Sequence, residues 1–94
     1  MRLTLQQQTA ITAAAKNTFG ESTSVWLFGS RADDSKKGGD IDLLVMSARL
    51  TTDDKRTIKM KLYELIGEQK IDIVLAADDS DPFVKLALAT GVKL

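Results

Sequence analysis

The chain has 94 residues, of which 44% are hydrophobic and 28% are charged, and this composition predicts one soluble globular domain over residues 1–94. Its 13 basic residues balance 13 acidic ones, so we do not expect a nucleic-acid polymer as partner. The sequence contains neither cysteine nor histidine, which excludes disulfides, thiolate and imidazole metal ligands, and histidine bases. Because its start has no apolar signal core and no apolar run approaches the length of a membrane span, we expect a cytoplasmic protein without a membrane partner.

The first predicted element is a helix from residue 5 to about residue 17, a stretch rich in helix-forming residues. Thr4 is a suitable N-cap for it and Gly20 a suitable stop. Its apolar side consists of Ile11, Ala14 and Ala15, with Ala10 and Phe19 at the margin. This pattern is typical of a helix whose role is packing.

Two strand-length runs follow the first helix. Residues 24–28 are mostly β-branched and aromatic, and residues 40–46 begin with alternating carboxylates and then become fully apolar, which predicts a buried second strand. The loop between them, residues 31–39, is polar and ends in two glycines. We interpret Trp26 as a core or flank residue of the first strand, because nothing nearby alternates with it as in a base-stacking surface.

A second helix is predicted after these strands. Thr51 and Asp54 resemble a capping box, and the helix runs from there to about residue 66, where Gly67 ends it. Its apolar stripe consists of Ile58, Leu62, Leu65 and Ile66.

The last part of the chain predicts a third strand, residues 70–76, and a short helix. Asp81 before Pro82 is typical of a helix N-terminus, and Gly91 closes the helix. This order of elements predicts an α/β (α+β) fold, in which a small mixed sheet carries helices packed mainly on one face.

Two polar pairs interrupt the apolar strands. Asp40 and Asp42 stand at positions i and i+2 of a strand, so their side chains project from one face, roughly 7 Å apart along the backbone. Two such carboxylates repel each other unless a cation lies between them, and their oxygens suit Mg²⁺. Gly29 lets backbone N–H groups approach a phosphate, and Ser30 adds a hydroxyl donor. Either pair alone is typical of an ordinary turn or strand edge, but together they indicate phosphoryl or nucleotidyl transfer.

The spacing of these two pairs, with a later isolated Asp72, resembles the minimal nucleotidyltransferases of the DNA polymerase beta superfamily over residues 25–92. The resemblance implies that family's fold and a mechanism with two Mg²⁺ ions. In it Asp40 and Asp42 bind both metals, while Asp72 binds the catalytic metal and helps to activate the acceptor hydroxyl. Without the resemblance, Asp72 would be a strand-end carboxylate bonded to a neighbour. We favour the metal site, because no other polar residue interrupts the run before Asp78.

The same resemblance assigns the phosphate-binding residues. It implies that Gly29 and Ser30 hold the β and γ phosphates of ATP, and that Arg31 or Lys36 adds positive charge there. Attack at the α-phosphorus then releases pyrophosphate.

The acceptor is expected to be another molecule, because 94 residues leave no room for the acceptor-binding domain of larger relatives. Stand-alone domains of this kind resemble antitoxins whose partner is a helical HEPN ribonuclease toxin. The likeness implies AMPylation of a toxin tyrosine in a type VII-like toxin–antitoxin pair. Two alternatives stay open: transfer to a small molecule, with a homodimer building the acceptor site across its interface, and a catalytically weak antitoxin that works by contact alone.

Overall fold

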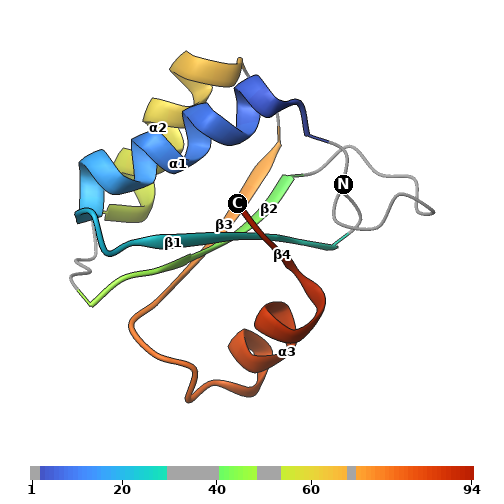
Figure 1. Ribbon diagram of the computed structural model, residues 1–94. Coiled ribbons are helices and arrows are strands. Elements are labelled where there is room, and N and C mark those ends of the chain that lie inside the picture. The colour runs from blue at the N-terminus through green and yellow to red at the C-terminus, as the bar shows by residue number, and fades with distance from the viewer. Residues whose placement is uncertain (1–2, 30–40, 49–53, 68–69) are drawn as a thin grey trace.

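The computed structural model describes residues 3–29, 41–48, 54–67 and 70–94, and it contains three helices and a four-stranded sheet (Figure 1). In chain order the elements are α1 (Leu5–Phe19), β1 (Ser24–Phe28), β2 (Ile41–Met46), α2 (Asp54–Ile66), β3 (Ile71–Ala76), α3 (Pro82–Thr90) and β4 (Val92–Lys93). The strand order across the sheet is β3-β2-β1-β4. Strands β2 and β3 are parallel, whereas β1 is antiparallel to both β2 and β4. The predicted mixed sheet is therefore confirmed, with β4 as a strand that the sequence did not reveal.

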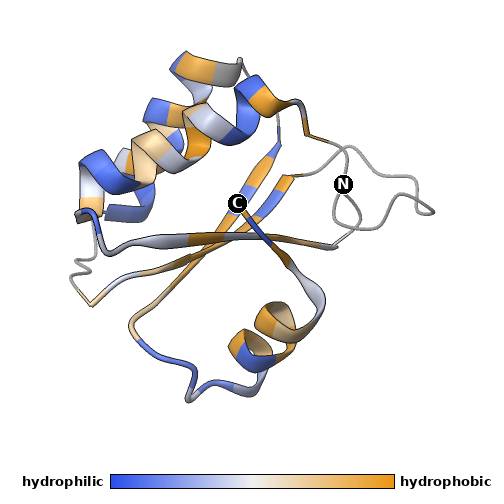
Figure 2. Cartoon of the chain, in the orientation of Figure 1, coloured by the Kyte–Doolittle hydropathy of each residue, from blue (hydrophilic) through white to orange (hydrophobic). Residues whose placement is uncertain are grey.

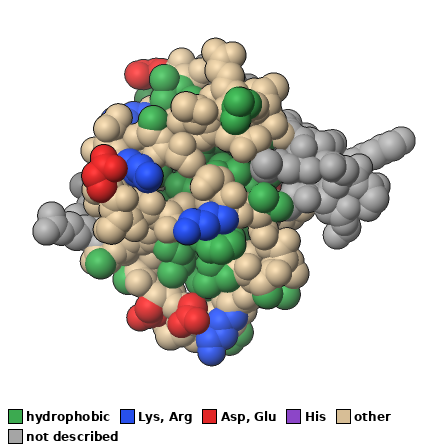
Figure 3. Space-filling model, viewed as in Figure 1, with side chains coloured by type: hydrophobic (Ala, Val, Ile, Leu, Met, Phe, Trp, Pro, Cys, Tyr) green, Lys and Arg blue, Asp and Glu red, His purple; other side chains and the backbone are tan. Residues whose placement is uncertain are grey.

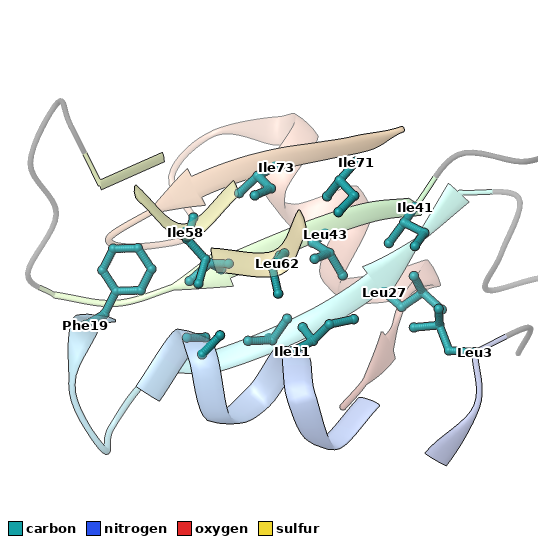
Figure 4. Close-up of a cluster of buried hydrophobic side chains, with 14 residues drawn as sticks. Leu3, Ile11, Phe19, Leu27, Ile41, Leu43, Ile58, Leu62, Ile71 and Ile73 are labelled. Atoms are coloured by element: carbon teal, nitrogen blue, oxygen red, sulfur yellow. The ribbon is translucent and has the colours of Figure 1, made fainter. Parts of the chain in front are cut away.

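The helices lie on both faces of this sheet. Helices α1 and α2 cover one face together, and α3 covers the other (Figure 1). The expectation that helices pack mainly on one face holds for α1 and α2. The larger hydrophobic core lies between these helices and the sheet, and its side chains include Ile11, Leu27, Ile41, Leu43, Ile58, Leu62, Ile71 and Ile73 (Figure 4).

Helix α1 begins and ends as predicted. The Gln7 N–H donates to the Thr4 hydroxyl at 3.0 Å, and the Gln7 side chain accepts from the Thr4 N–H at 3.0 Å, which completes a capping box. Gly20 ends the helix with φ +113°. Its buried side consists of Ile11, Ala14, Ala15 and Phe19. Hydrophobic and hydrophilic residues follow one another along α1 and α2 in Figure 2.

Helix α2 differs from its predicted stripe at one position. Ile58 and Leu62 are buried, but Leu65 is 56% exposed. The prediction that Leu65 belongs to the apolar stripe facing the core was therefore wrong. The reason is the neighbouring surface of α1, where Ala10 and Ala13 are too short to cover Leu65 across the shallow groove that these residues line. The other predicted stripe and cap positions, the Ile66 side chain and Thr51, lie outside the described residues.

Helix α3 packs on the second face, and strand β4 extends the sheet beside β1. The Phe83 N–H donates to the Asp81 carboxylate at 2.8 Å with Pro82 between them, which confirms the predicted N-cap. Trp26 is half-buried on this face, as predicted, and the Lys93 Nζ lies 5.9 Å from its ring centroid in a cation–π contact. No helix in the described ranges is long and apolar enough to cross a membrane.

Candidate active site

Three of the predicted site residues, Gly29, Asp42 and Asp72, lie where three strands meet. Strand β1 runs opposite to β2 and β3, so the end of β1 lies beside the starts of the other two. Figure 4 shows Leu27, Ile41 and Ile71 at this end of the sheet. The register pairs Phe28 with Asp42, and Asp42 with Asp72. Residues that are 30 positions apart in the chain are therefore direct neighbours.

Asp42 and Asp72 lie on the face of the sheet that α3 covers. The flanking residues of both strands are buried in the α1 and α2 core, and successive strand residues point to opposite faces. Neighbouring strands lie about 4.8 Å apart, so the two carboxylates stand side by side on this face. Asp42 is half-buried and Asp72 is exposed. Paired carboxylates within solvent reach are a fitting donor set for a hard divalent cation.

Gly29 follows β1 directly and lies against Asp42. Its φ is +75°, a left-handed conformation that favours glycine. A Cβ on Gly29 would overlap the Asp42 carboxylate, with the Asp42 Cγ only 3.2 Å away. Glycine is therefore needed here both for the turn and for the position of a predicted metal ligand. The sequence pointed to this glycine only as a phosphate-binding residue.

Four of the predicted site residues lie outside the described residues: Ser30, Arg31, Lys36 and Asp40. Their roles stay predictions. Within residues 3–29, 41–48, 54–67 and 70–94, no three acidic, histidine or cysteine side chains come together as metal ligands. Asp42 and Asp72 thus form two members of the predicted set of three, and Asp40 is the third.

The sequence did not reveal how α3 is joined to the site. The rings of Phe28 and Phe83 meet edge to face, with centroids 5.6 Å apart at 80°. Gly91, predicted only as the end of α3, also permits a close approach, since a Cβ there would lie 2.9 Å from the Leu27 carbonyl oxygen. Helix α3 therefore packs closely on the end of β1 that precedes Gly29. Gly91 was the single sequence signal for this close packing.

The surroundings of the sheet carry charges of both signs. On the face drawn in Figure 3, acidic and basic side chains are interspersed among polar and hydrophobic ones. A hollow of about 350 Å³ lies at the other end of β1, beside Ser24 and Val25, and Lys16, Glu21 and Lys93 are among its lining residues. This hollow is remote from the carboxylate pair. The candidate site is the carboxylate pair and not the hollow.

Comparison with known protein families agrees with this geometry. A family model described as polymerase beta, nucleotidyltransferase matches residues 8–94, which include every strand of the sheet and most of α1. The match supports a general role in nucleotidyl transfer. Enzymes of this family use a nucleotide substrate and a divalent metal ion.

Proposed function

Since the chain belongs to the polymerase beta nucleotidyltransferase family, we propose that it transfers AMP from ATP to a tyrosine of a partner protein. The partner is a helical HEPN ribonuclease toxin, and the chain acts as its antitoxin. Modification of the tyrosine silences the toxin.

One observation carries the nucleotidyl transfer itself. Asp42 lies between Gly29 on one neighbouring strand end and Asp72 on the other strand. Gly29, which we predict to bind phosphates, and a pair of carboxylates are thereby neighbours. Phosphoryl chemistry depends mainly on such positioning and charge stabilisation.

The predicted roles follow from this order across the sheet. Asp40, Asp42 and Asp72 would hold two Mg²⁺ ions. When bound, the ions neutralise the charge that develops on the attacking and leaving oxygens. A site of carboxylates and metal ions needs no histidine for this chemistry, in agreement with the composition.

The phosphates of ATP would lie on the β1 side of the site. Backbone N–H groups after Gly29 and the Ser30 hydroxyl would donate to the β and γ phosphates, and Arg31 or Lys36 would add positive charge. This arrangement orients the α-phosphorus toward the carboxylates.

The acceptor would lie on the β3 side. The tyrosine oxygen forms a bond to the α-phosphorus while the bond between this phosphorus and the oxygen of the leaving pyrophosphate breaks. Asp72 takes the proton from the tyrosine hydroxyl. The products are the AMP-tyrosine ester and pyrophosphate.

The substitution Asp72→Asn tests this proposal. It should change ATP affinity by less than about threefold, because Gly29 and Asp42 remain, but lower AMP transfer by about 100-fold or more. The measurements are calorimetry with ATP and Mg²⁺, and incubation with labelled ATP and the product of the neighbouring gene.

The control is Glu21→Gln, which removes an exposed carboxylate at the other end of β1, away from the carboxylate pair and from β3. It should leave both ATP affinity and transfer as in the parent chain. Normal transfer by Asp72→Asn would remove Asp72 from the site. Lost transfer with intact silencing of the toxin would instead support neutralisation by contact alone.

A further inference from the structure

Strand β3 is the outer strand of the sheet on the side of Asp72. It pairs with β2 across six residues, and no strand in the described part of the chain pairs with its other edge. Figure 4 shows β3 as the outermost of the three strands that carry the core side chains. Its outer edge therefore presents backbone groups to a possible partner.

The hydrogen bonds to β2 identify which backbone groups face outward. The Ile41 N–H donates to the Lys70 carbonyl at 2.9 Å, and the Ser47 N–H donates to the Ala76 carbonyl at 3.1 Å. Backbone groups alternate sides along a parallel strand, so the even-numbered residues of β3 bond to β2. The N–H and C=O groups of Ile71, Ile73 and Leu75 consequently point away from β2.

This edge carries one charged side chain, Asp72, and lacks the other features that discourage strand addition. Edge strands are commonly protected by lysine, proline or a bulge. Residues 71–76 contain neither lysine nor proline, and their register with β2 continues without a bulge. Ile71 and Ile73 are also anchored in the core, so the edge is held rigid. Pairing with another strand would therefore cost β3 little conformational entropy.

The position and charge of the edge favour a particular occupant. Gly29, Asp42 and Asp72 follow one another across the ends of β1, β2 and β3. No described strand lies beyond Asp72 on the side opposite Gly29, and this side is where we place the acceptor. An added strand would place one of its side chains beside Asp72, about 5 Å away. Asp78, Asp79 and Asp81 are exposed just beyond β3, whereas Lys70 is the single basic residue between positions 70 and 81. These three carboxylates lie beyond the end of β3 that is away from Asp72, so they suit basic residues at that end of an added segment.

We propose that the outer edge of β3 binds an extended, basic segment of the acceptor protein as a fifth strand, with the acceptor hydroxyl beside Asp72. The inference rests on the proposed function for the transfer step, but the binding step is measured separately. Main-chain pairing supplies the affinity, and Asp72 selects the hydroxyl-bearing position.

Amide hydrogen exchange tests this pairing in the unmodified chain. When the product of the neighbouring gene is added, exchange should slow by at least about tenfold at Ile71, Ile73 and Leu75, whose amides face outward. Exchange at Asp72 and Val74 should change little, since their amides already bond to β2. Uniform protection along β3, or no protection, would overturn the inference.

A matched pair of variants gives a second test. Leu75→Pro removes an outward N–H without removing a bond to β2, whereas Leu75→Ala shortens the same side chain and keeps the N–H. Affinity for the partner should fall at least about tenfold in Leu75→Pro relative to Leu75→Ala, at unchanged ATP affinity. Equal affinities would contradict edge pairing. If Leu75→Pro does not fold, the exchange pattern decides alone.

Two outcomes separate the binding step from its alternatives. A concentration-dependent dimer of the parent chain, with the same alternating protection in the absence of partner, would assign the edge to a second copy and overturn the proposal. Alternating protection by the partner without any AMP transfer would instead contradict the proposed function and leave the binding edge in place.

Discussion

The two faces of the sheet differ in how completely they are covered. On the face of α1 and α2, Leu27, Ile41 and Leu43 are fully buried. On the other face Leu44 is fully buried, but the sheet residues Trp26, Phe28 and Val74 are only partly buried. Helix α3 has nine residues and is about 14 Å long, whereas α1 has 15 residues and is about 22 Å long.

The short cover leaves room for polar chemistry. Asp42 and Asp72 lie on the α3 face, where solvent and a cation can reach them. An unpaired carboxylate on the closed face would carry a large desolvation cost. The comparison teaches that one face supplies the stability of the sheet and the other holds the candidate site.

The largest expected effect comes from breaking the closed face. Leu43→Ala should lower the free energy of unfolding by about 2 to 5 kcal/mol, because it leaves a cavity in the core. Chemical denaturation measures it. Leu65→Ala, at a site that is 56% exposed, is the control and should stay within about 0.5 kcal/mol of the parent. A comparable loss in both variants would contradict the assigned core.

The adjacent residue tests the open face. Asp42→Asn should lower AMP transfer by about 100-fold, equivalent to about 2.7 kcal/mol of activation free energy, because an amide holds a metal ion poorly. The fold should stay intact, because the amide has nearly the same size and shape as the carboxylate. Transfer at the parental rate would remove Asp42 from the site, and a large loss of stability would assign it a structural role.

Gly29 connects the sheet to the site, and Gly29→Ala should act on both. The left-handed φ should cost about 1 to 3 kcal/mol of stability, and the added Cβ should displace the Asp42 carboxylate and weaken Mg²⁺ binding. Gly67→Ala is the control, since Gly67 has φ +86° with nothing within 4 Å of its Cβ position. It should lose stability and keep Mg²⁺ affinity in calorimetry. Equal Mg²⁺ affinity in both variants would contradict the contact of Gly29 with Asp42.

The smallest expected effect has the opposite sign. Thr23 is 5% exposed, and among the described residues its Oγ1 is buried without a hydrogen-bond partner. Thr23→Val should therefore raise the free energy of unfolding by up to about 1 kcal/mol. Thr18→Val should not, because the Thr18 hydroxyl donates to the Ala14 carbonyl at 2.8 Å. A loss of stability in Thr23→Val would indicate that this hydroxyl is solvated.

Features that depend on neighbouring residues were predictable from the sequence. The cap at Thr4, the N-cap at Asp81 and the strands on either side of the polar loop follow from local hydrogen bonding and residue periodicity. The candidate carboxylates stood out because they interrupt apolar strands. Leu65 was predicted wrongly, since its burial depends on the size of side chains on another helix rather than on its own period.

The tertiary structure alone decided how these parts meet. The pairing of Asp42 with Asp72, the contact of Gly29 with Asp42 and the two-residue strand β4 each join segments that are distant along the chain. The division of the helices between the two faces was also decided at this level. A local pattern states which side of an element is apolar, but the register and the choice of face depend on which packing of all elements buries those sides together.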